Sequence, residues 1–142
     1  MPASLTDESA VAALLESCGL PHRDIAPHLA HFMVARDGSR VVGVIGLEVH
    51  GTEGLLRSLA VVPDRRSEGI ARRLYASLIV RARQLGLTRL CLLTTSAQGF
   101  FEMLGFRVVS RAAVPEAIRA TEEFRQLCPD SATCMMRSMP RE

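Results

Sequence analysis

Lysine is absent from this chain, and all 17 basic residues are arginine. Chemistry that requires a lysine amine, such as the phosphate lysine of a Walker motif or a Schiff base, is therefore excluded. Cysteine is sparse, and the four cysteines, Cys18, Cys91, Cys128 and Cys134, include no C-x-x-C pair. This spacing indicates neither a disulfide framework nor a zinc site, and we expect no metal.

Long uniform runs are also missing. No segment approaches 18 consecutive apolar residues, and no basic stretch followed by an apolar run opens the chain, so neither a membrane span nor a leader is expected. The net charge is +2 and no five like charges are contiguous, which argues against binding to nucleic acid or to a membrane surface. With 142 residues, 48% of them hydrophobic, the sequence predicts one cytoplasmic globular domain spanning residues 1–142.

The first half of the chain has the pattern of two helices followed by three strands. Thr6 is a candidate N-cap for a helix over residues 7–17, and residues 21–30 can form a short second helix. Glycine-containing turns separate three segments rich in β-formers: residues 31–35, 41–49 and 55–62. We expect these three strands to form an antiparallel meander.

The second half begins with a β-α-β pattern. Residues 69–85 have helical apolar spacing, and residues 89–95 are nearly all apolar at their centre, which is typical of a strand covered on both sides. The remaining expected elements are a helix over residues 97–104, a strand over 106–110, a helix over 114–127 and a last strand over 132–136.

The turn Arg66-Ser67-Glu68-Gly69-Ile70-Ala71, between a strand and a helix, is a candidate anion site. The first amides of a helix have no intrahelical partner and lie at the positive end of the helix dipole. Gly69 and Ala71 would let a phosphate approach the backbone closely, and Arg66 could add a charge-assisted hydrogen bond. The alternative is an ordinary turn with glycine at a tight corner.

Residues 41–109 resemble the GCN5-related N-acetyltransferase (GNAT) family. The resemblance is carried by the strand LAVVP, the turn RRSEGIA, the helix and buried strand that follow, and the segment AQGFFEMLGF. It implies an α/β (α+β) fold, with a mixed, mostly antiparallel sheet of six or seven strands, splayed central strands and about four to five flanking helices. Only residues 1–5 remain for the first strand of that fold, which is expected to be stunted or absent.

The resemblance also implies acetyl-CoA as co-substrate. The backbone of Leu59, Ala60 and Val61 would hold the acetyl carbonyl and the pantetheine arm, and the turn would cradle the pyrophosphate. The implied coenzyme-binding residues are Leu59, Ala60, Val61, Arg66, Ser67, Glu68, Gly69, Ile70, Ala71, Arg72, Thr94 and Phe101. Dimers are common in the family, and a homodimer involving an exposed final strand with Met135 and Met136 is one expectation.

Within the family, four segments are similar to the small acetyltransferases linked to arsenic-resistance operons: GLEVHG, LLRSLAV, LLTTSAQGFFEMLGF and VPEAIRATEEFRQLCPDSATCM. This resemblance implies a small amine acceptor, either amino-acid-like or arsenical. A pair formed by Cys128 and Cys134 could bind a thiophilic arsenic species, but packing is the favoured interpretation. His28 and His31 have helical spacing without an evident third ligand, so they are not assigned to a metal.

Glu48 is the candidate general base, because it lies near the end of an apolar strand beside the strand that would hold the acetyl group. The alternative is a carboxylate facing solvent. Arg57 and Ser58 precede the acetyl-holding residues, and since neighbours on a strand point to opposite faces, only one should face the acceptor. We favour Arg57, whose planar fork suits a substrate carboxylate, although it could instead pair with Glu48 or Glu53.

The usual proton donor for the leaving thiolate is missing. Phe101 stands where the family usually has tyrosine, and Thr94 replaces a frequent asparagine. Expelling a thiolate with a pKa of about 8.5 at pH 7 costs on the order of 2 kcal/mol relative to the thiol, so a missing acid slows the step without abolishing it. Thr94, Thr95, Ser96 or a water could substitute, whereas Tyr75 is expected to pack in the helix core.

These observations predict an N-acetyltransferase that acts on a small amine by direct attack. One alternative is a non-catalytic acetyl-CoA-binding sensor, which Phe101 and the acidic Glu68 in the phosphate turn would favour. A second alternative is a scaffold that binds no coenzyme.

Overall fold

Six strands form one mixed sheet in the computed structural model, which describes residues 2–127 and 131–139. The strands are β1 (Met33–Asp37), β2 (Arg40–His50), β3 (Glu53–Val61), β4 (Arg89–Thr94), β5 (Arg107–Val108) and β6 (Thr133–Ser138). Their order across the sheet is β1-β2-β3-β4-β6-β5, and within the described residues every neighbouring pair is antiparallel except β3 and β4. The expected fold class is therefore confirmed, as are the β1-β2-β3 meander and the β-α-β unit.

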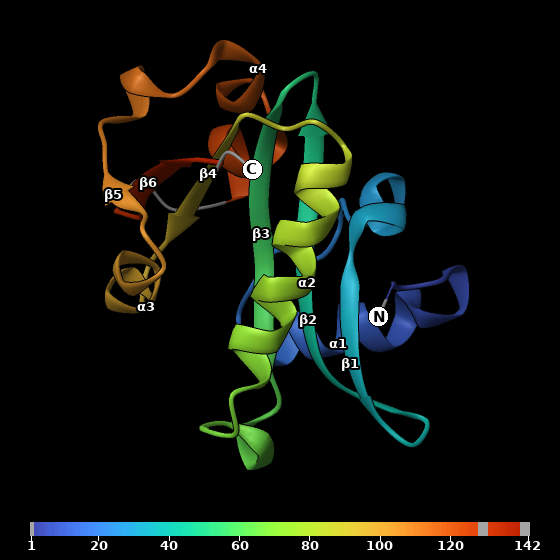
Figure 1. The fold of residues 1–142 in the computed structure, drawn as a ribbon. Coiled ribbons are helices and arrows are strands. Elements are labelled where there is room, and N and C mark those ends of the chain that lie inside the picture. The colour runs from blue at the N-terminus through green and yellow to red at the C-terminus, as the bar shows by residue number, and fades with distance from the viewer. Residues whose placement is uncertain (1, 128–130, 140–142) are drawn as a thin grey trace.

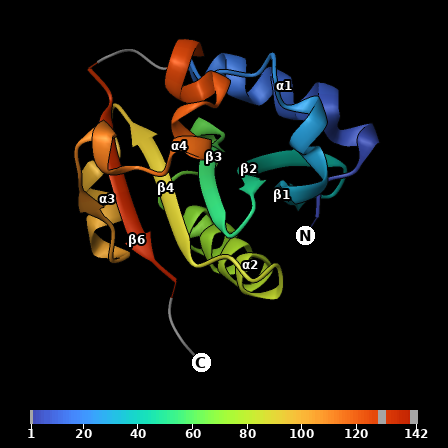
Figure 2. The same cartoon turned by 90° about the horizontal axis from the view of Figure 1, so that it is seen from above.

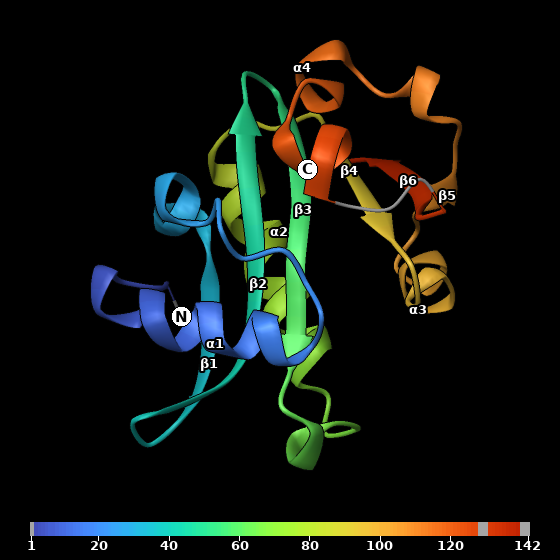
Figure 3. The same ribbon diagram turned by 180° about the vertical axis from the view of Figure 1, so that it is seen from behind.

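Helices cover both faces of this sheet. The α-helices are α1 (Glu8–Ser17), α2 (Ile70–Gln84), α3 (Gln98–Met103) and α4 (Glu116–Arg119). Shorter helical segments are η1 (Leu5–Asp7), η2 (Ala26–His31), η3 (Pro63–Arg65), η4 (Arg111–Ala113) and the π-helical η5 (Glu123–Leu127). The long helix α2 lies along β2 and β3 on one face (Figure 1), and α1 crosses the opposite face (Figure 3). Seen from above, α4 lies on the same side of the sheet as α1 (Figure 2).

The expected helix over residues 114–127 is wrong as one continuous element. It is divided into α4 and η5, with a break at residues 120 and 121. Thr121 explains the break, because its hydroxyl donates to the Ile118 carbonyl at 2.7 Å and accepts from the Phe124 amide at 3.4 Å. A threonine side chain that bonds to nearby backbone groups competes with regular helical bonds.

Two smaller expectations, the Thr6 cap and the regular second helix, are corrected, and a third, the stunted first strand, is confirmed. Thr6 does not cap α1, because the Asp7 carboxylate accepts from the Ser4 amide at 2.8 Å and forms a capping box around η1. The short second helix is the 3-10 segment η2. The first strand of the family fold is reduced, in the described residues, to a single bridge between Pro2 and Met33.

The final strand is not exposed, which corrects the expected dimer surface. β6 lies between β4 and β5, and Met135 and Met136 are buried within the sheet. Cys91 and Cys134 pack in the same region as small apolar side chains, and burial raises the pKa of the Cys91 thiol to about 12. The proposed pairing with Cys128 lies outside the described residues.

No helix in the described ranges is long and apolar enough to cross a membrane.

A bulge in β3 opens the centre of the sheet. Ala60 pairs with Val44 and Arg57 pairs with Gly46, so Ser58 and Leu59 both lie opposite Ile45. Ser58 has a φ of 60°, and such an extra residue bends the strand that carries it. β3 pairs with β4 only from Glu53 to Leu55, although both strands continue well past that point. The expected splay of the two central strands is therefore confirmed.

Candidate active site

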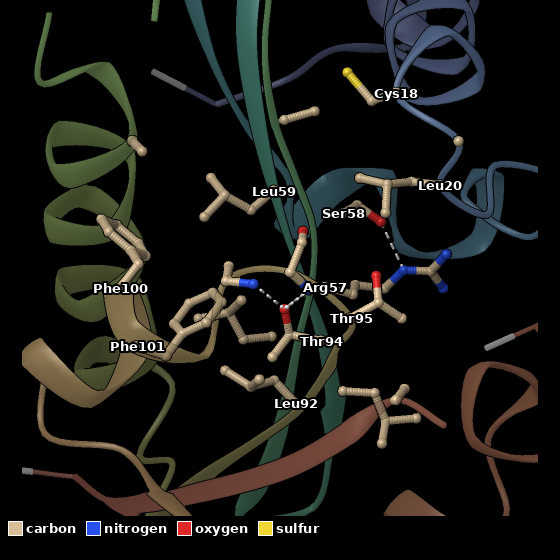
Figure 4. Close-up of a pocket in the computed structure, with 18 of the residues that line it drawn as sticks. Cys18, Leu20, Arg57, Ser58, Leu59, Leu92, Thr94, Thr95, Phe100 and Phe101 are labelled. Atoms are coloured by element: carbon tan, nitrogen blue, oxygen red, sulfur yellow. Dashed lines mark hydrogen bonds between the residues drawn. The ribbon is translucent and has the colours of Figure 1, made fainter. Parts of the chain in front are cut away.

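The splayed strands border a cavity of about 460 Å³. Its walls come from β3, from β4 and the loop after it, from α3, from the segment after α1, from the start of α2 and from η5. The lining residues are Cys18, Gly19, Leu20, Pro21, Leu56, Arg57, Ser58, Leu59, Ala60, Val61, Arg66, Ala71, Leu92, Leu93, Thr94, Thr95, Ser96, Ala97, Phe100, Phe101, Glu123 and Ala132. Phe100 and Phe101 lie across the cavity from Cys18 and Leu20 (Figure 4).

One end of the cavity reaches the first turn of α2. Gly69 is the N-cap residue, with a φ of 78° that favours glycine, and no side chain caps the helix. The first amides of α2 are therefore available to an anion, as the sequence predicts. Arg66 and Ala71 both line the cavity on either side of this N-terminus.

Most of the expected coenzyme residues are brought together here. Seven of them line the cavity: Leu59, Ala60, Val61, Arg66, Ala71, Thr94 and Phe101. Ser67, Glu68, Gly69 and Arg72 lie in the exposed turn and first helical residues between or beside these positions. Ile70 differs, because its buried side chain faces β2 and meets the position that a Cβ on Gly43 would occupy, 2.9 Å away.

Glu68, the acidic residue in the turn before α2, is paired with a neighbouring arginine. Glu68 accepts from the Arg65 guanidinium at 2.9 Å, and Arg65 also pairs with Asp37 at 2.7 Å. The carboxylate of Glu68 is therefore offset by an arginine that does not line the cavity, and Arg66 and Arg72 keep this end of the site basic.

The part of the cavity lined by Thr94 and Phe101 carries a hydroxyl but no tyrosine. Thr94 accepts from the Ala97 amide at 2.9 Å, which leaves its hydroxyl hydrogen available to a partner in the cavity. Phe101 packs edge to face against Phe100 and Phe106, with ring centroids 5.3 and 5.5 Å apart. Tyr75 does not line the cavity, and its hydroxyl receives a hydrogen bond from Arg137 at 3.1 Å.

Arg57 is engaged by protein carboxylates. Its two terminal nitrogens donate to Asp24 at 2.6 and 2.7 Å, one of them also donates to Glu48 at 2.6 Å, and Nε donates to the Ser58 hydroxyl at 2.9 Å. Burial alone would lower its pKa, but the hydrogen bonds and charges of these acids raise it above the usual value, so Arg57 is a fixed cation. The pairing with Glu48 is confirmed, whereas Glu53 pairs with Arg89 at 2.8 Å.

Arg57 and Ser58 both reach the cavity, so the expectation that only one of them faces it is wrong. The positive φ of Ser58 interrupts the alternation of side chains along β3. The predicted contact of Arg57 with a substrate carboxylate would have to displace Asp24, which occupies both of its terminal nitrogens.

Glu48 is buried, so the solvent-facing alternative is wrong. One carboxylate oxygen accepts from Arg57, and the other lies 3.0 Å from His50 Nε2 and 3.4 Å from His28 Nε2. Glu48 does not line the cavity. His28 and His50 thus contact the same carboxylate. The described residues contain no group of three or more potential ligands that could hold a metal ion.

Glu123 is a candidate that the sequence did not reveal. It lines the cavity from η5, and its Oε1 lies 3.6 Å from Arg57 Nε. Burial, together with the charges of Glu48 and Asp24, raises the pKa of its carboxyl to about 7, although Arg57 opposes this shift. In the sequence, Glu123 looks like its exposed neighbour Glu122, and only the helix break at Thr121 distinguishes them.

The cavity therefore combines free helix amides and arginines at one end with a carboxylate of near-neutral pKa at the other. Between them lie the backbone of a splayed strand and the Thr94 hydroxyl. Such a site can hold an anionic, extended cofactor and remove a proton from a second molecule.

Comparisons with known proteins agree with this geometry. Amino-acid acetyltransferase from Neisseria meningitidis is 30% identical over 94 residues, which are 65% of this chain and 22% of that protein. The crystal structure of N-acetylglutamate synthase from Neisseria gonorrhoeae, complexed with coenzyme A and L-arginine, has a TM-score of 0.84 and 27% identity over 99% of this chain and 33% of that chain. The chain thus spans a fifth to a third of the length of these relatives.

A fold of similar length occurs in Rv2747 from Mycobacterium tuberculosis, solved in complex with CoA and NLQ. It has a TM-score of 0.84 and 24% identity, and the match covers 99% of this chain and 98% of that one. The model of the acetyltransferase (GNAT) domain matches residues 28–108, which is more than half of the chain. This chain therefore belongs to the GNAT family of acetyltransferases.

Proposed function

We propose that this domain transfers the acetyl group of acetyl-CoA to the amine of a small acceptor by direct attack. One observation carries the proposal: the cavity between the splayed strands runs from the uncapped N-terminus of α2 to the carboxylate of Glu123. The α2 end suits the pyrophosphate, and Leu59, Ala60 and Val61 line the path to the acetyl group. A cytoplasmic location and a homodimer stay predictions.

The acceptor is an amino acid or a compound that resembles one. The names of the Neisseria relatives support this class, as does the cavity size, which suits a small molecule beside the acetyl group. The arsenical acceptor implied by the resemblance to arsenic-linked enzymes stays a prediction, and none of the relatives described above is named for arsenic.

Two measurements test this function. Calorimetry should show saturable binding of acetyl-CoA, and its absence would eliminate every coenzyme-dependent role. Release of free thiol should then be followed with a panel of amines that includes amino acids, phosphinic amino acids and arsenical amino acids. The amine that gives the highest kcat/KM identifies the acceptor class.

A non-catalytic acetyl-CoA sensor is the second candidate, and Phe101 favours it because no tyrosine lies in the cavity among the described residues. A sensor would bind acetyl-CoA tightly but release no thiol with any amine in the panel. The enzyme would release thiol with at least one of them.

A further inference from the structure

We propose that Glu123 is the general base that takes the proton from the acceptor ammonium, and that Arg57, clamped by Asp24 and Glu48, positions it. The proposal deepens the acetyltransferase function above and rests on it. It assigns the base to η5, near the C-terminus, and not to β2, which carries Glu48.

Access to the cavity selects Glu123 among the acids of this region. Asp24, Glu48 and Glu123 all interact with Arg57, but Glu123 is the one acidic side chain among the described residues that line the cavity. Glu48 has both oxygens occupied, by Arg57 and by the two histidines. A base must reach the proton that it removes, and only Glu123 meets this condition directly.

The position of Glu123 along the cavity fits the reaction. Arg57, which lies 3.6 Å from its carboxylate, is two residues before Leu59 on β3. Leu59, Ala60 and Val61 form the stretch proposed to hold the acetyl group. An amine placed beside the acetyl carbon would therefore lie between this strand and the carboxylate, with the coenzyme on the opposite side at α2.

Burial first, and the neighbouring acids second, give Glu123 a proton affinity suited to a base, because both raise the pKa of its carboxyl. Asp24 from the loop before η2 and Glu48 from β2 disfavour its ionised form, while Arg57 from β3 favours it. His28 and His50 contact the Glu48 oxygen that does not accept from Arg57, at 3.4 and 3.0 Å. A carboxyl with a pKa near neutrality is ionised often enough to accept a proton and basic enough to hold one.

The step balances with acetyl-CoA as donor. Glu123 takes one proton from the acceptor ammonium, and the neutral nitrogen forms a bond to the acetyl carbon. The bond from that carbon to sulfur breaks and its electron pair leaves with the thiolate. A second proton leaves the nitrogen and is taken up by the thiolate, and Glu123 returns its proton to solvent. The products are the N-acetyl compound, coenzyme A and one proton.

The test compares Glu123→Gln with Glu122→Gln, a matched change at the exposed neighbouring position. Thiol release is measured across about pH 5.5 to 9, a range that brackets the titration of a carboxyl group whose pKa is near neutrality. For the wild type, kcat/KM should rise with pH through about 7. Glu123→Gln should lower kcat/KM by about 10²- to 10⁴-fold and remove this rise, while acetyl-CoA binding by calorimetry stays within about threefold. Glu122→Gln should leave all three quantities unchanged.

Two further variants separate chemistry from folding and from Glu48. Glu123→Asp keeps an ionisable group and should restore part of the rate together with the pH dependence. Glu48→Gln removes a negative neighbour of Glu123 and should shift the rise in kcat/KM to lower pH, whereas a direct base at position 48 would instead lose the rise.

Failure of the inference and failure of the function are distinguishable. An active wild type with an unchanged rate and pH profile in Glu123→Gln would overturn Glu123 as the base. A wild type that binds acetyl-CoA but releases no thiol with any acceptor would overturn the proposed function, and with it the role of Glu123.

Discussion

At the scale of single residues, we propose that Thr94 assists the leaving thiolate in place of the missing tyrosine. It lines the cavity, and its oxygen already accepts from the Ala97 amide, which orients the hydroxyl so that its hydrogen can be donated elsewhere. Phe101, which is expected to replace the family tyrosine, packs its apolar ring on Phe100 and Phe106. The Thr94 hydroxyl on β4 would therefore donate to the thiolate in the same cavity that Phe101 lines from α3.

Thr94→Val should reduce kcat with little effect on acetyl-CoA binding, because valine keeps the shape and loses the donor. A hydrogen bond to a charged partner contributes about 1.5 to 3 kcal/mol, which corresponds to a reduction of roughly 10- to 100-fold. Thr94→Ser should retain most of the rate. Thr95→Val is the matched control, since Thr95 also lines the cavity. If a stopped assay of thiol release gives equal rates for Thr94→Val and the wild type, then a group other than Thr94 donates the proton to the thiolate.

At the scale of elements, the N-terminus of α2 is the part of the cavity that we propose holds the coenzyme pyrophosphate. Ala71, the second residue of α2, lines the cavity. Its small side chain leaves the helix backbone open to an anion. A larger side chain at this position would occupy the space that the coenzyme needs, whereas the helix itself would tolerate it because alanine and leucine have similar helix propensities.

Ala71→Leu should weaken acetyl-CoA binding at least tenfold, or about 1.4 kcal/mol, in a calorimetric titration. Ala76→Leu places the same side chain on the exposed part of the same helix and should bind acetyl-CoA like the wild type. Equal affinity for both variants would mean that the coenzyme does not pass close to Ala71.

β2 also carries a glycine that packing requires. A Cβ at Gly46 would lie 2.5 Å from the ring of Phe32, which is fully buried between β2 and its neighbours. The contact holds η2 and the segment before β1 against the sheet, and the same region carries Asp24, the partner of Arg57.

Gly46→Ala should lower the free energy of unfolding by about 1 to 3 kcal/mol, because overpacking a dense core forces neighbours to shift. The measurement is urea denaturation followed by circular dichroism. Gly99→Ala in α3 is the control, since nothing lies within 4 Å of its added methyl, and it should be neutral or stabilising by up to about 1 kcal/mol. A Gly46→Ala variant as stable as Gly99→Ala would show that Phe32 moves aside freely.

At the scale of the whole molecule, Arg57 connects four parts of the chain. It lies on β3 and interacts with Asp24 before η2, with Glu48 on β2 and with Glu123 on η5. One buried cation thus compensates three acids from separate segments. Removing it would leave these acids buried without their counter-charge.

Arg57→Met should destabilise the fold by about 3 to 5 kcal/mol at pH 8, as is typical when one partner of a buried ion pair is lost. The pKa of Asp24 is lowered in the folded wild type, since its pairing with Arg57 outweighs the opposing effect of burial. The wild type therefore gains stability from this carboxylate above its unfolded pKa and loses it as pH falls. Without Arg57 the same buried acids resist ionisation. The difference in the free energy of unfolding between the wild type and Arg57→Met should therefore shrink toward pH 4. Urea denaturation at several pH values measures it, and a pH-independent difference would contradict this account.

Local patterns in the sequence determined the elements around the proposed coenzyme end of the cavity. The apolar spacing of residues 69–85 and the run from Leu90 to Leu93 encode the β-α-β unit, because each depends on residues close together in the chain. The turn before α2 depends on the positive φ of Gly69, which is a local property of glycine. The absence of lysine likewise excludes whole classes of chemistry without any knowledge of the fold.

Only the tertiary structure decided the other end of the cavity, where we propose that the acceptor binds. The bulge at Ser58 depends on how β2 and β3 pair, and it brings Arg57 and Ser58 to the same cavity against the usual alternation. Arg57 meets Asp24 across 33 residues of sequence, and it meets Glu123 across an even longer separation. Glu122 and Glu123 are identical in type, but the break at Thr121 leaves one exposed and the other buried beside an arginine. Burial and long-range charge pairing set the chemistry of such a group, and neither is encoded by its neighbours in the chain.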